Sequence, residues 1–465
     1  MAITITPPIK PDHWLPSANP IIYSISTTTI NARLSYIIDV YINGSQVVQM
    51  KYPVYDRSNM NIDLSRVVND YLSENFVNDL TVNSGHFHFN PTETCSLSIR
   101  VTEEYWNGTQ MVLDTSNAVF VKEIYIWLAG ANFQQSRDLT KFEHIFKWNI
   151  PVNNEHPKFM GAKNDAFITG IHEVEKIIYL AQPQAFQAAY KIDMNTPRTI
   201  GFFTFGYSYP PGDIADRYYV WVYNSKFQRT KEYVFINPDA SALGTNSYSK
   251  GIAQMPCSPY NINQMVSNNE WSAINLTTYG STKYIDPNKD DDKYYVVFTH
   301  EGWGIGMGYE WGYRAVPFEI VPCTHYQVYN ILYKTLEGSW WQIRTEMKNH
   351  QETDVKRSVM YNTWGLRAGE VLPNSKTFKR VMHVEGNGTI TLNTDWIGNQ
   401  GVIEEIEEML VSPDIYLVTN TELGEVVYIP VVLKDQSYQI YNKKQDKLFQ
   451  YEFEFEEAYK KTTLI

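Results

Sequence analysis

The sequence predicts a mainly β protein, built of several sandwich-like or barrel-like modules with few short helices. Tyrosine, with 34 residues, and tryptophan, with 12, are abundant in the 465-residue chain, and both favour pleated, half-buried surfaces. Clusters of Asn, Gly, Pro and Ser recur at the spacing of strands joined by turns. The repeated long helical patterns that a TIM barrel or a doubly wound sheet needs do not occur. A chain of this length is expected to hold roughly two to four domains.

The first 20 residues are rich in proline and predict an extended N-terminal arm over residues 1–20. Proline has no amide to donate, so we do not expect this arm to build a sheet of its own. It can instead lie on a neighbouring subunit.

An N-terminal β domain is expected over residues 21–124. Asn43-Gly44 and Asn107-Gly108 are typical of tight hairpin turns, since both residue types tolerate a positive φ. The strands that these turns join are predicted at 33–42, 47–55, 97–105 and 110–113. Residues 64–71 predict a short helix with Asp63 near its cap.

A central β domain with long loops is expected over residues 125–322. A helix is possible at 134–146. The predicted strands are 166–171, 176–181, 199–205, 218–223, 232–236 and 294–299. Residues 237–292 are rich in Ser, Asn, Tyr and Gly and have few strand signals. Loops of that length are usually functional or are ordered by a partner.

Residues 323–465 predict a C-terminal β module with one helix, with its core in 378–465. A turn is expected at the Glu-Gly-Asn-Gly sequence of 385–388. Residues 402–411 predict an amphipathic helix, with Ile403, Ile406 and Leu410 on the buried face and four glutamates mostly on the other. Ser412-Pro413 ends this helix. Strands are expected at 414–419, 425–433 and 448–456, and the last alternates Phe449, Tyr451, Phe453 and Phe455 with polar residues, so that one face is buried.

One segment has the beginning of a metal-binding pattern. Asp286, Asn288 and Asp290 have the spacing of the first three ligands of a calcium loop. The pattern then fails, because Asp291 stands where glycine is needed and Val297 where glutamate is needed. The three residues are weak metal candidates, and a solvated acidic turn is the alternative.

The other patterns do not predict catalysis or a cofactor. His172 lacks the second histidine of a zinc-protease motif, because Lys176 occupies that position. The cysteines are too far apart for a metal pair or a disulfide framework, and we expect them to be small buried hydrophobes: Cys95, Cys257 and Cys323. We therefore expect a protein that is not an enzyme.

Alternating glycines at 302–308 leave one face of the segment bare. Trp303, Met307, Tyr309 and Trp311 are the candidates for a subunit interface or a tip that faces a lumen. The alternative is a close backbone approach or a flexible loop.

The charge and the hydropathy of the chain exclude two classes of partner. The formal net charge is −12, and no basic stripe of the kind that binds duplex DNA occurs. A mildly acidic wall suits a conduit through which DNA slides without sticking. The chain shows no secretory signal and no apolar run that could span a bilayer, so we expect it to be made and assembled in a cytoplasm.

Three parts of the chain carry a recognisable pattern: Asn61–Ser73, Cys323–Trp341 and the C-terminal order of strand, helix, Ser-Pro and three strands. Together they resemble virion structural proteins of tailed phages of Bacteroidota, including crAss-like podoviruses. The resemblance implies a tail, neck or baseplate component of the virion, which forms a homo-oligomeric ring with other tail, neck or portal proteins. Two other hypotheses stay open: a non-catalytic adhesin or glycan-binding module, and a hydrolase with carboxylates on distant loops.

Overall fold

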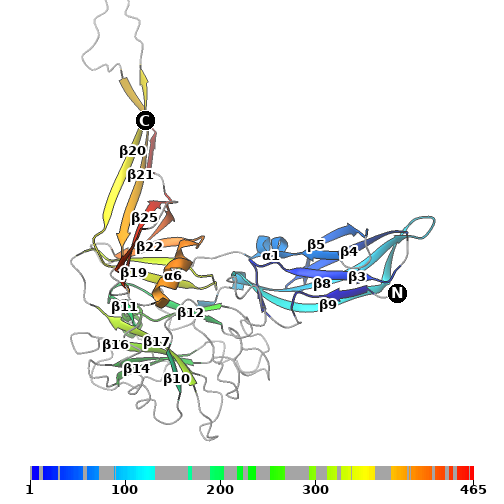
Figure 1. Cartoon of the computed structure of the whole chain (residues 1–465), viewed down its shortest axis with the longest axis horizontal. Coiled ribbons are helices and arrows are strands. Elements are labelled where there is room, and N and C mark those ends of the chain that lie inside the picture. The colour runs from blue at the N-terminus through cyan, green and yellow to red at the C-terminus, as the bar shows by residue number, and fades with distance from the viewer. Residues whose placement is uncertain are drawn as a thin grey trace, which may run out of the picture. The chain divides into compact units, whose positions relative to one another are not determined.

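The computed structural model shows a protein made mainly of β-sheets, as the sequence predicts (Figure 1). The structure describes residues 3–9, 14–29, 32–55, 60–72, 88–89, 91–130, 166–169, 189–203, 217–223, 229–236, 252–267, 293–299, 312–321, 326–336, 338–361, 379–394, 397, 400–420, 425–434, 439–443, 448–459 and 461–464.

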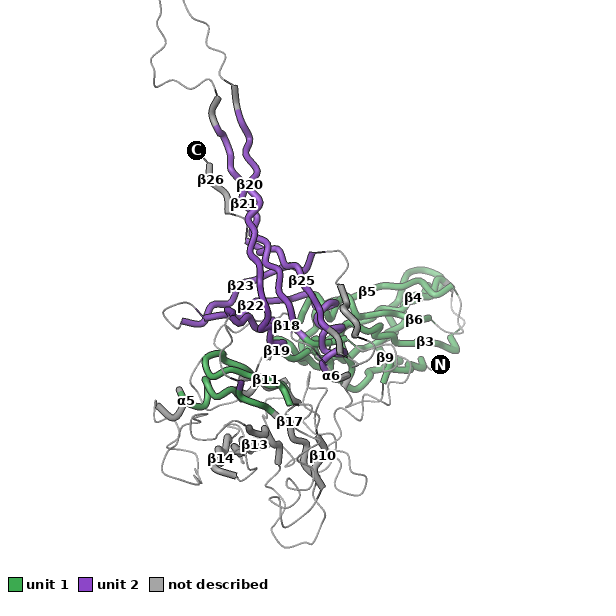
Figure 2. The backbone as a smooth tube through the Cα atoms, turned by 60° about the vertical axis from the view of Figure 1, so that its left-hand side comes forward, with its two compact units in different colours: residues 1–320, 335–341 green, residues 321–334, 342–465 purple. Residues whose placement is uncertain are grey.

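The chain divides into two compact units, coloured separately in Figure 2. Unit 1 holds residues 1–320 and 335–341, and unit 2 holds residues 321–334 and 342–465. The sequence assigned 335–341 to the C-terminal module, but its contacts place it in unit 1.

The N-terminal part of unit 1 is a two-layer β-sandwich. One sheet has the order β1-β3-β6 and the other the order β2-β9-β8-β4-β5. The elements are β1 (Ile3–Thr6), β2 (Trp14–Pro16), β3 (Ile22–Thr27), β4 (Ala32–Ile42), β5 (Ser45–Pro53), β6 (Met60–Asp63), α1 (Ser65–Tyr71), the 3₁₀ turn η2 (Pro91–Glu93), β8 (Thr94–Trp106) and β9 (Met111–Trp127). Buried aliphatic and aromatic side chains from both sheets and from α1 form one continuous core. The predicted boundary at residue 124 falls inside β9.

Both predicted Asn-Gly hairpins are confirmed. Asn43 (φ 50°) and Gly44 (φ 77°) turn the chain between β4 and β5. Gly108 (φ 103°) does the same between β8 and β9, where Asn107 Oδ1 accepts hydrogen bonds from the amides of Thr109 (2.9 Å) and Gln110 (3.0 Å). Glycine, and asparagine more than most other residues, tolerates this left-handed backbone.

The predicted short helix is also confirmed, with Asp63 just before it. Asp63 Oδ1 accepts hydrogen bonds from the amides of Ser65 (2.9 Å) and Ile21 (3.0 Å). Partial burial acts to raise the pKa of Asp63, but these hydrogen bonds outweigh it and the pKa is lowered. Asp63 thus ties the start of α1 to the start of β3.

Residues 1–20 are not a separate extended arm, because two of their strands join the sheets of the sandwich. β1 pairs antiparallel with β3, and β2 pairs parallel with β9. Ile3 and Leu15 lie in the sandwich core. The prolines of this segment stand between or at the ends of the strands, so the alternating Ile-Thr-Ile-Thr sequence keeps its amides for pairing.

The rest of unit 1 holds two further sheets and a helix. The sheet orders are β10-β17-β16-β13-β14, with β11 on β17, and β12-β15-β7. The elements are β7 (His88–Phe89), β10 (Ala166–Thr169), β11 (Tyr190–Ile192), β12 (Thr199–Phe203), β13 (Arg217–Tyr223), β14 (Arg229–Ile236), β15 (Ile252–Pro256), α5 (Pro259–Ser267), β16 (Lys293–Thr299) and β17 (Gly312–Ile320). The helix predicted at 134–146 and the strand at 176–181 lie outside the described residues.

The segment 237–292 is not only loop, because it contains β15 and α5. Ser258 Oγ accepts a hydrogen bond from the amide of Asn261 (3.2 Å), and Pro259 opens the helix. Serine at the cap and proline at the first helical position are typical start signals of a helix. The sequence reading missed this Ser-Pro signal.

Unit 2 is built on one large sheet with the order β19-β18-β22-β23-β25-β21-β20, in which the first two residues of β19 are assigned to unit 1. β24 pairs with β25, and β26 pairs with β21. The elements are β18 (Tyr329–Lys334), β19 (Trp340–Thr345), β20 (His350–Tyr361), β21 (Lys379–Asn393), α6 (Gln400–Leu410), β22 (Ile415–Asn420), β23 (Val426–Leu433), β24 (Gln439–Lys443), β25 (Leu448–Glu457) and β26 (Lys461–Leu464). The sheet therefore includes strands that precede the predicted core at 378–465.

The predicted alternation in β25 is confirmed, since Tyr451, Phe453 and Phe455 are buried while Glu452 and Glu454 are exposed. In α6, Ile403 and Ile406 are buried as expected.

One detail of the predicted helix face is wrong, because Met409 is fully buried where Leu410 was expected. Glu405, which is only 1% exposed, is the exception among the glutamates predicted to lie mostly on the other face. The buried face of α6 is therefore rotated slightly from the predicted one, and it includes Glu405 beside Ile406.

Candidate assembly surface

Every candidate residue that the sequence singled out lies outside the described residues. These are the metal candidates Asp286, Asn288 and Asp290 and the interface candidates Trp303, Met307, Tyr309 and Trp311. Both sets stay predictions.

The described part of the chain contains neither a candidate metal cluster nor a helix that could cross a membrane. No group of three or more His, Cys, Asp or Glu side chains there could hold a metal ion. None of its helices has the length and apolar character that a bilayer crossing requires.

The most unusual surface of unit 2 is a long β-hairpin. We call this hairpin the arm, and it is distinct from the N-terminal arm predicted at residues 1–20. It consists of β20 and the part of β21 that faces it, from His350 opposite Thr391 to Tyr361 opposite Lys379. Figures 1 and 2 show the arm running away from the rest of unit 2. Residues 350–358 are all exposed, on both faces of the strand. A strand of a globular sheet normally buries one face, so residues 350–358 of β20 contribute no side chain to a core, although Ile390 on the paired part of β21 is buried.

The base of the arm is fixed to the sheet by side-chain hydrogen bonds. Gln351 Nε2 donates to the hydroxyl of Tyr329 in β18 (2.6 Å). Asn393 Nδ2 donates to the carbonyl oxygen of Lys348 (2.9 Å). The direction in which the arm leaves the sheet is therefore set by the fold of unit 2.

The turn predicted at 385–388 does not exist, because these residues lie inside β21. They pair with 353–356 of β20, and 383–386 also pair with β26 on the other side. A Cβ atom at Gly388 would lie 2.6 Å from the carboxyl carbon of Glu457. Glycine serves here for a close approach of a neighbouring side chain rather than for a turn.

Acidic side chains gather on one side of the arm's base. Lys434 Nζ donates to Glu454 Oε1 (2.6 Å). This hydrogen bond, with the charges of Glu454, Glu456 and Asp354, raises the pKa of Lys434. Asp354 belongs to β20, so the acidic group reaches onto the arm.

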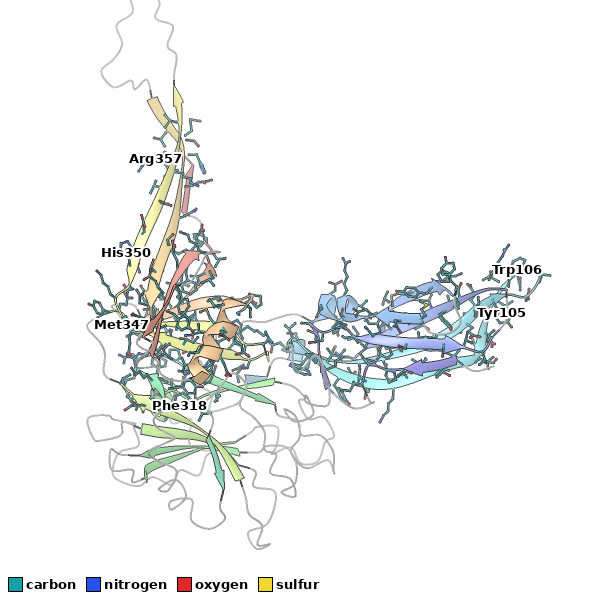
Figure 3. All side chains as sticks on the ribbon, viewed as in Figure 1. Tyr105, Trp106, Phe318, Met347, His350 and Arg357 are labelled. Carbon is teal, nitrogen blue, oxygen red and sulfur yellow. The ribbon has the colours of Figure 1, made fainter. Side chains whose placement is uncertain are left out.

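The next part of the arm carries the opposite charge. Lys356 and Arg357 are exposed on β20, and Figure 3 shows Arg357 far along the arm, beyond His350 at its base.

The outer edge of β20 is open. β20 ends the strand order of its sheet, and no described strand pairs with its second edge. Its backbone amides and carbonyls on that side are available to another strand.

Unit 1 buries charged side chains, and hydrogen bonds or aromatic contacts hold them in place. Glu103 in β8 is 1% exposed, and its carboxylate accepts hydrogen bonds from the hydroxyls of Thr27 and Thr29 (the latter 2.7 Å). Thr27 belongs to the other sheet, so this contact joins the two layers of the sandwich. Burial and the charge of Glu103 raise the pKa of Tyr36 to about 12.

A second buried charge is Arg198, which is 2% exposed. Its guanidinium carbon lies 4.3 Å from the ring centroid of Trp341, 5.4 Å from that of Tyr190 and 5.3 Å from that of Phe318. Cation–π contacts of this kind stabilise a desolvated guanidinium. All four residues belong to unit 1, and the contacts fix the segment 335–341 in that unit.

The sequence reading missed the arm, Glu103 and Arg198. The charge order of 352–357 could have indicated an exposed strand, whereas the glycines at 386 and 388 are compatible with a turn as well as with a strand.

Comparisons with known proteins assign the chain to no family. No protein-family model matches the chain, and no curated protein matches it in sequence. The arm, its open edge and its charge order are therefore the features on which a function can be argued.

Proposed function

We propose that this chain is a non-catalytic structural protein of a bacteriophage tail or neck, which assembles with copies of itself into a ring around the DNA conduit of the virion. Three segments that resemble virion proteins of tailed Bacteroidota phages support the proposal. The mainly β architecture and the acidic net charge are consistent with a component of such a conduit.

The observation that carries the proposal is the arm. A strand exposed on both faces gains little from the hydrophobic burial that stabilises most sheets, so the isolated chain derives little stability from it. Hydrogen bonds at its base nevertheless hold it in one direction. A strand that is held in one direction and exposed on both faces suits a contact with another subunit, where these faces become buried.

Closed symmetry explains how such contacts saturate. A head-to-tail contact between identical subunits produces a ring when the rotation closes and a filament when it does not. A component of a conduit requires the closed form.

Cryo-electron microscopy of the virions, with mass spectrometry of their proteins, tests the proposal. We expect the chain in the tail or neck as a cyclic assembly with the arm buried against a neighbour. A chain that is absent from particles, or that is present there without cyclic symmetry, would contradict it. A glycan array probed with the purified protein tests the glycan-binding alternative separately.

A further inference from the structure

The open edge of β20 has a regular segment that ends at a defined point. The register between β20 and β21 runs without interruption from His350 to Ser358 and shifts between Ser358 and Val359. Such a bulge bends a strand and ends its regular pairing. Residues 350–358 therefore offer a straight edge of ~30 Å to another strand.

Charge along this edge follows a simple order. Glu352 and Asp354 come first, and Lys356 and Arg357 follow. All four are exposed, and within the part of the chain that the structure describes, no ion pair engages Glu352, Lys356 or Arg357. Val355 stands between the two halves and is 44% exposed.

The position of Val355 leaves its side chain without a neighbour across the hairpin. Its partner on β21 is Gly386, which has no side chain. Thr353, two residues before, likewise faces Gly388. Cross-strand contacts stabilise a sheet, and on this face of β20 they are missing on the β21 side.

We propose that β20 pairs antiparallel with β20 of a second copy of this chain, across a twofold axis that passes through Val355. In this register Asp354 lies opposite Lys356 of the second copy, and the same pair repeats on the other side of the axis. Glu352 is then a diagonal neighbour of that Lys356, and the two Val355 side chains meet at the axis. Directly opposite side chains of an antiparallel pair are ~5 Å apart, which suits both the ion pairs and the valine contact.

The order of charges favours a second copy of β20 as the partner, and it favours antiparallel over parallel pairing. Two β20 strands paired parallel and in register would place acid against acid and base against base, and like charges directly opposite destabilise a sheet. Antiparallel pairing brings the acidic half of each strand to the basic half of the other. The strand therefore complements itself.

This contact goes beyond the proposed ring and does not depend on it. A twofold contact is complete with two copies, so it cannot by itself close a ring of many. It describes an association that the purified chain makes without any other virion protein.

Charge-reversal variants of the full chain test the pairing by sedimentation over a range of concentrations. The acid-reversed variant is Glu352→Lys with Asp354→Lys, and the base-reversed variant is Lys356→Glu with Arg357→Glu. We expect the unaltered chain to dimerise and each variant to dimerise at least about tenfold more weakly, because opposite charges become like charges. An equimolar mixture of the two variants, and one chain carrying all four changes, should dimerise like the unaltered chain.

These last two samples also exclude misfolding as the cause. A damaged arm would not recover its affinity on mixing or on addition of two further substitutions. Recovery in both samples supports the proposal, and failure in both overturns it.

Disulfide cross-linking tests the register. Val355→Cys should form a dimer with itself on oxidation, because the residue lies on the axis. Thr353→Cys should not, since it faces Arg357 of the second copy, but it should cross-link to Arg357→Cys in a mixture. The unaltered chain, with its native cysteines, gives the background.

Two results would overturn the inference. One is an unaltered chain that stays monomeric at concentrations well above the dissociation constants of weak interfaces. The edge of β20 would then bind a different partner. The other is self-cross-linking of Thr353→Cys that equals that of Val355→Cys. Neither result affects the proposed ring, whose test is the symmetry of the chain in virions.

Discussion

The N-terminal sandwich and the arm are both made of long antiparallel strands, but they are stabilised differently. In β4 of the sandwich, Tyr36, Ile38 and Val40 are fully buried, and they face a second sheet. In β20 of the arm, every residue from 350 to 358 is exposed. Backbone pairing runs along both strands, with one register shift in each ladder. The comparison shows that pairing defines a strand, whereas burial decides whether a substitution in it matters for folding.

The largest difference should appear when the same residue type is changed in each region. Val40→Asp places a charge in the sandwich core and should cost about 3–5 kcal/mol. Val355→Asp lies on the exposed arm and should change stability by less than about 0.5 kcal/mol. Thermal unfolding of dilute protein, followed by circular dichroism, gives both values. Equal losses would mean that the arm is buried within the isolated chain.

A smaller effect should follow from the buried carboxylate that joins the layers of the sandwich. Thr27→Val removes one of the two hydroxyl donors to Glu103 and should cost about 2 kcal/mol, because a buried charged group loses a partner. The matched change on the arm, Thr353→Val, should be almost neutral, since Thr353 is exposed. Chemical denaturation compares the two. A neutral Thr27→Val would show that this contact does not hold the layers together.

Two close-approach glycines extend the comparison to the rest of unit 1, because Gly201 lies in β12, outside the sandwich, and Gly388 lies in the arm. Gly201→Ala puts a Cβ atom onto the Cβ of Ser339, which is next to the backbone, and should cost about 1–3 kcal/mol. Gly388→Ala meets only the carboxyl end of Glu457, which can move, and should cost less than about 1 kcal/mol. Melting temperatures of the two variants test this order. The reverse order would mean that Glu457 is held rigidly against the arm.

The smallest effect concerns pH. The pKa of Asp63 is lower in the folded chain than in the unfolded chain, so its contribution is present above the unfolded pKa of about 3.9 and is lost as the pH falls through the folded pKa. Asp63→Asn should remove this acid-dependent part, worth no more than about 0.5 kcal/mol for an exposed group. Denaturation midpoints at pH 7 and near pH 3 measure it. Parallel acid curves for the two proteins would contradict the prediction.

Local sequence determined the elements whose conformation is set by a few neighbouring residues. Asn43-Gly44 and Asn107-Gly108 form the expected turns because few other residues adopt a positive φ readily. The alternation of Tyr451, Phe453 and Phe455 fixed which face of β25 is buried, because a strand has a period of two. The mainly β fold follows from many such segments.

Tertiary structure alone decided the features that the candidate surface depends on. The glycines at 386 and 388 are compatible with a turn or a strand, and pairing with β20 and β26 selected the strand. Residues 3–6 became β1 because β3 offers an edge to them. Glu103 and Arg198 are charged and would be placed on the surface from sequence, but hydroxyl and aromatic partners distant in the chain allow their burial. Such partners are long-range neighbours, and a local pattern does not contain them.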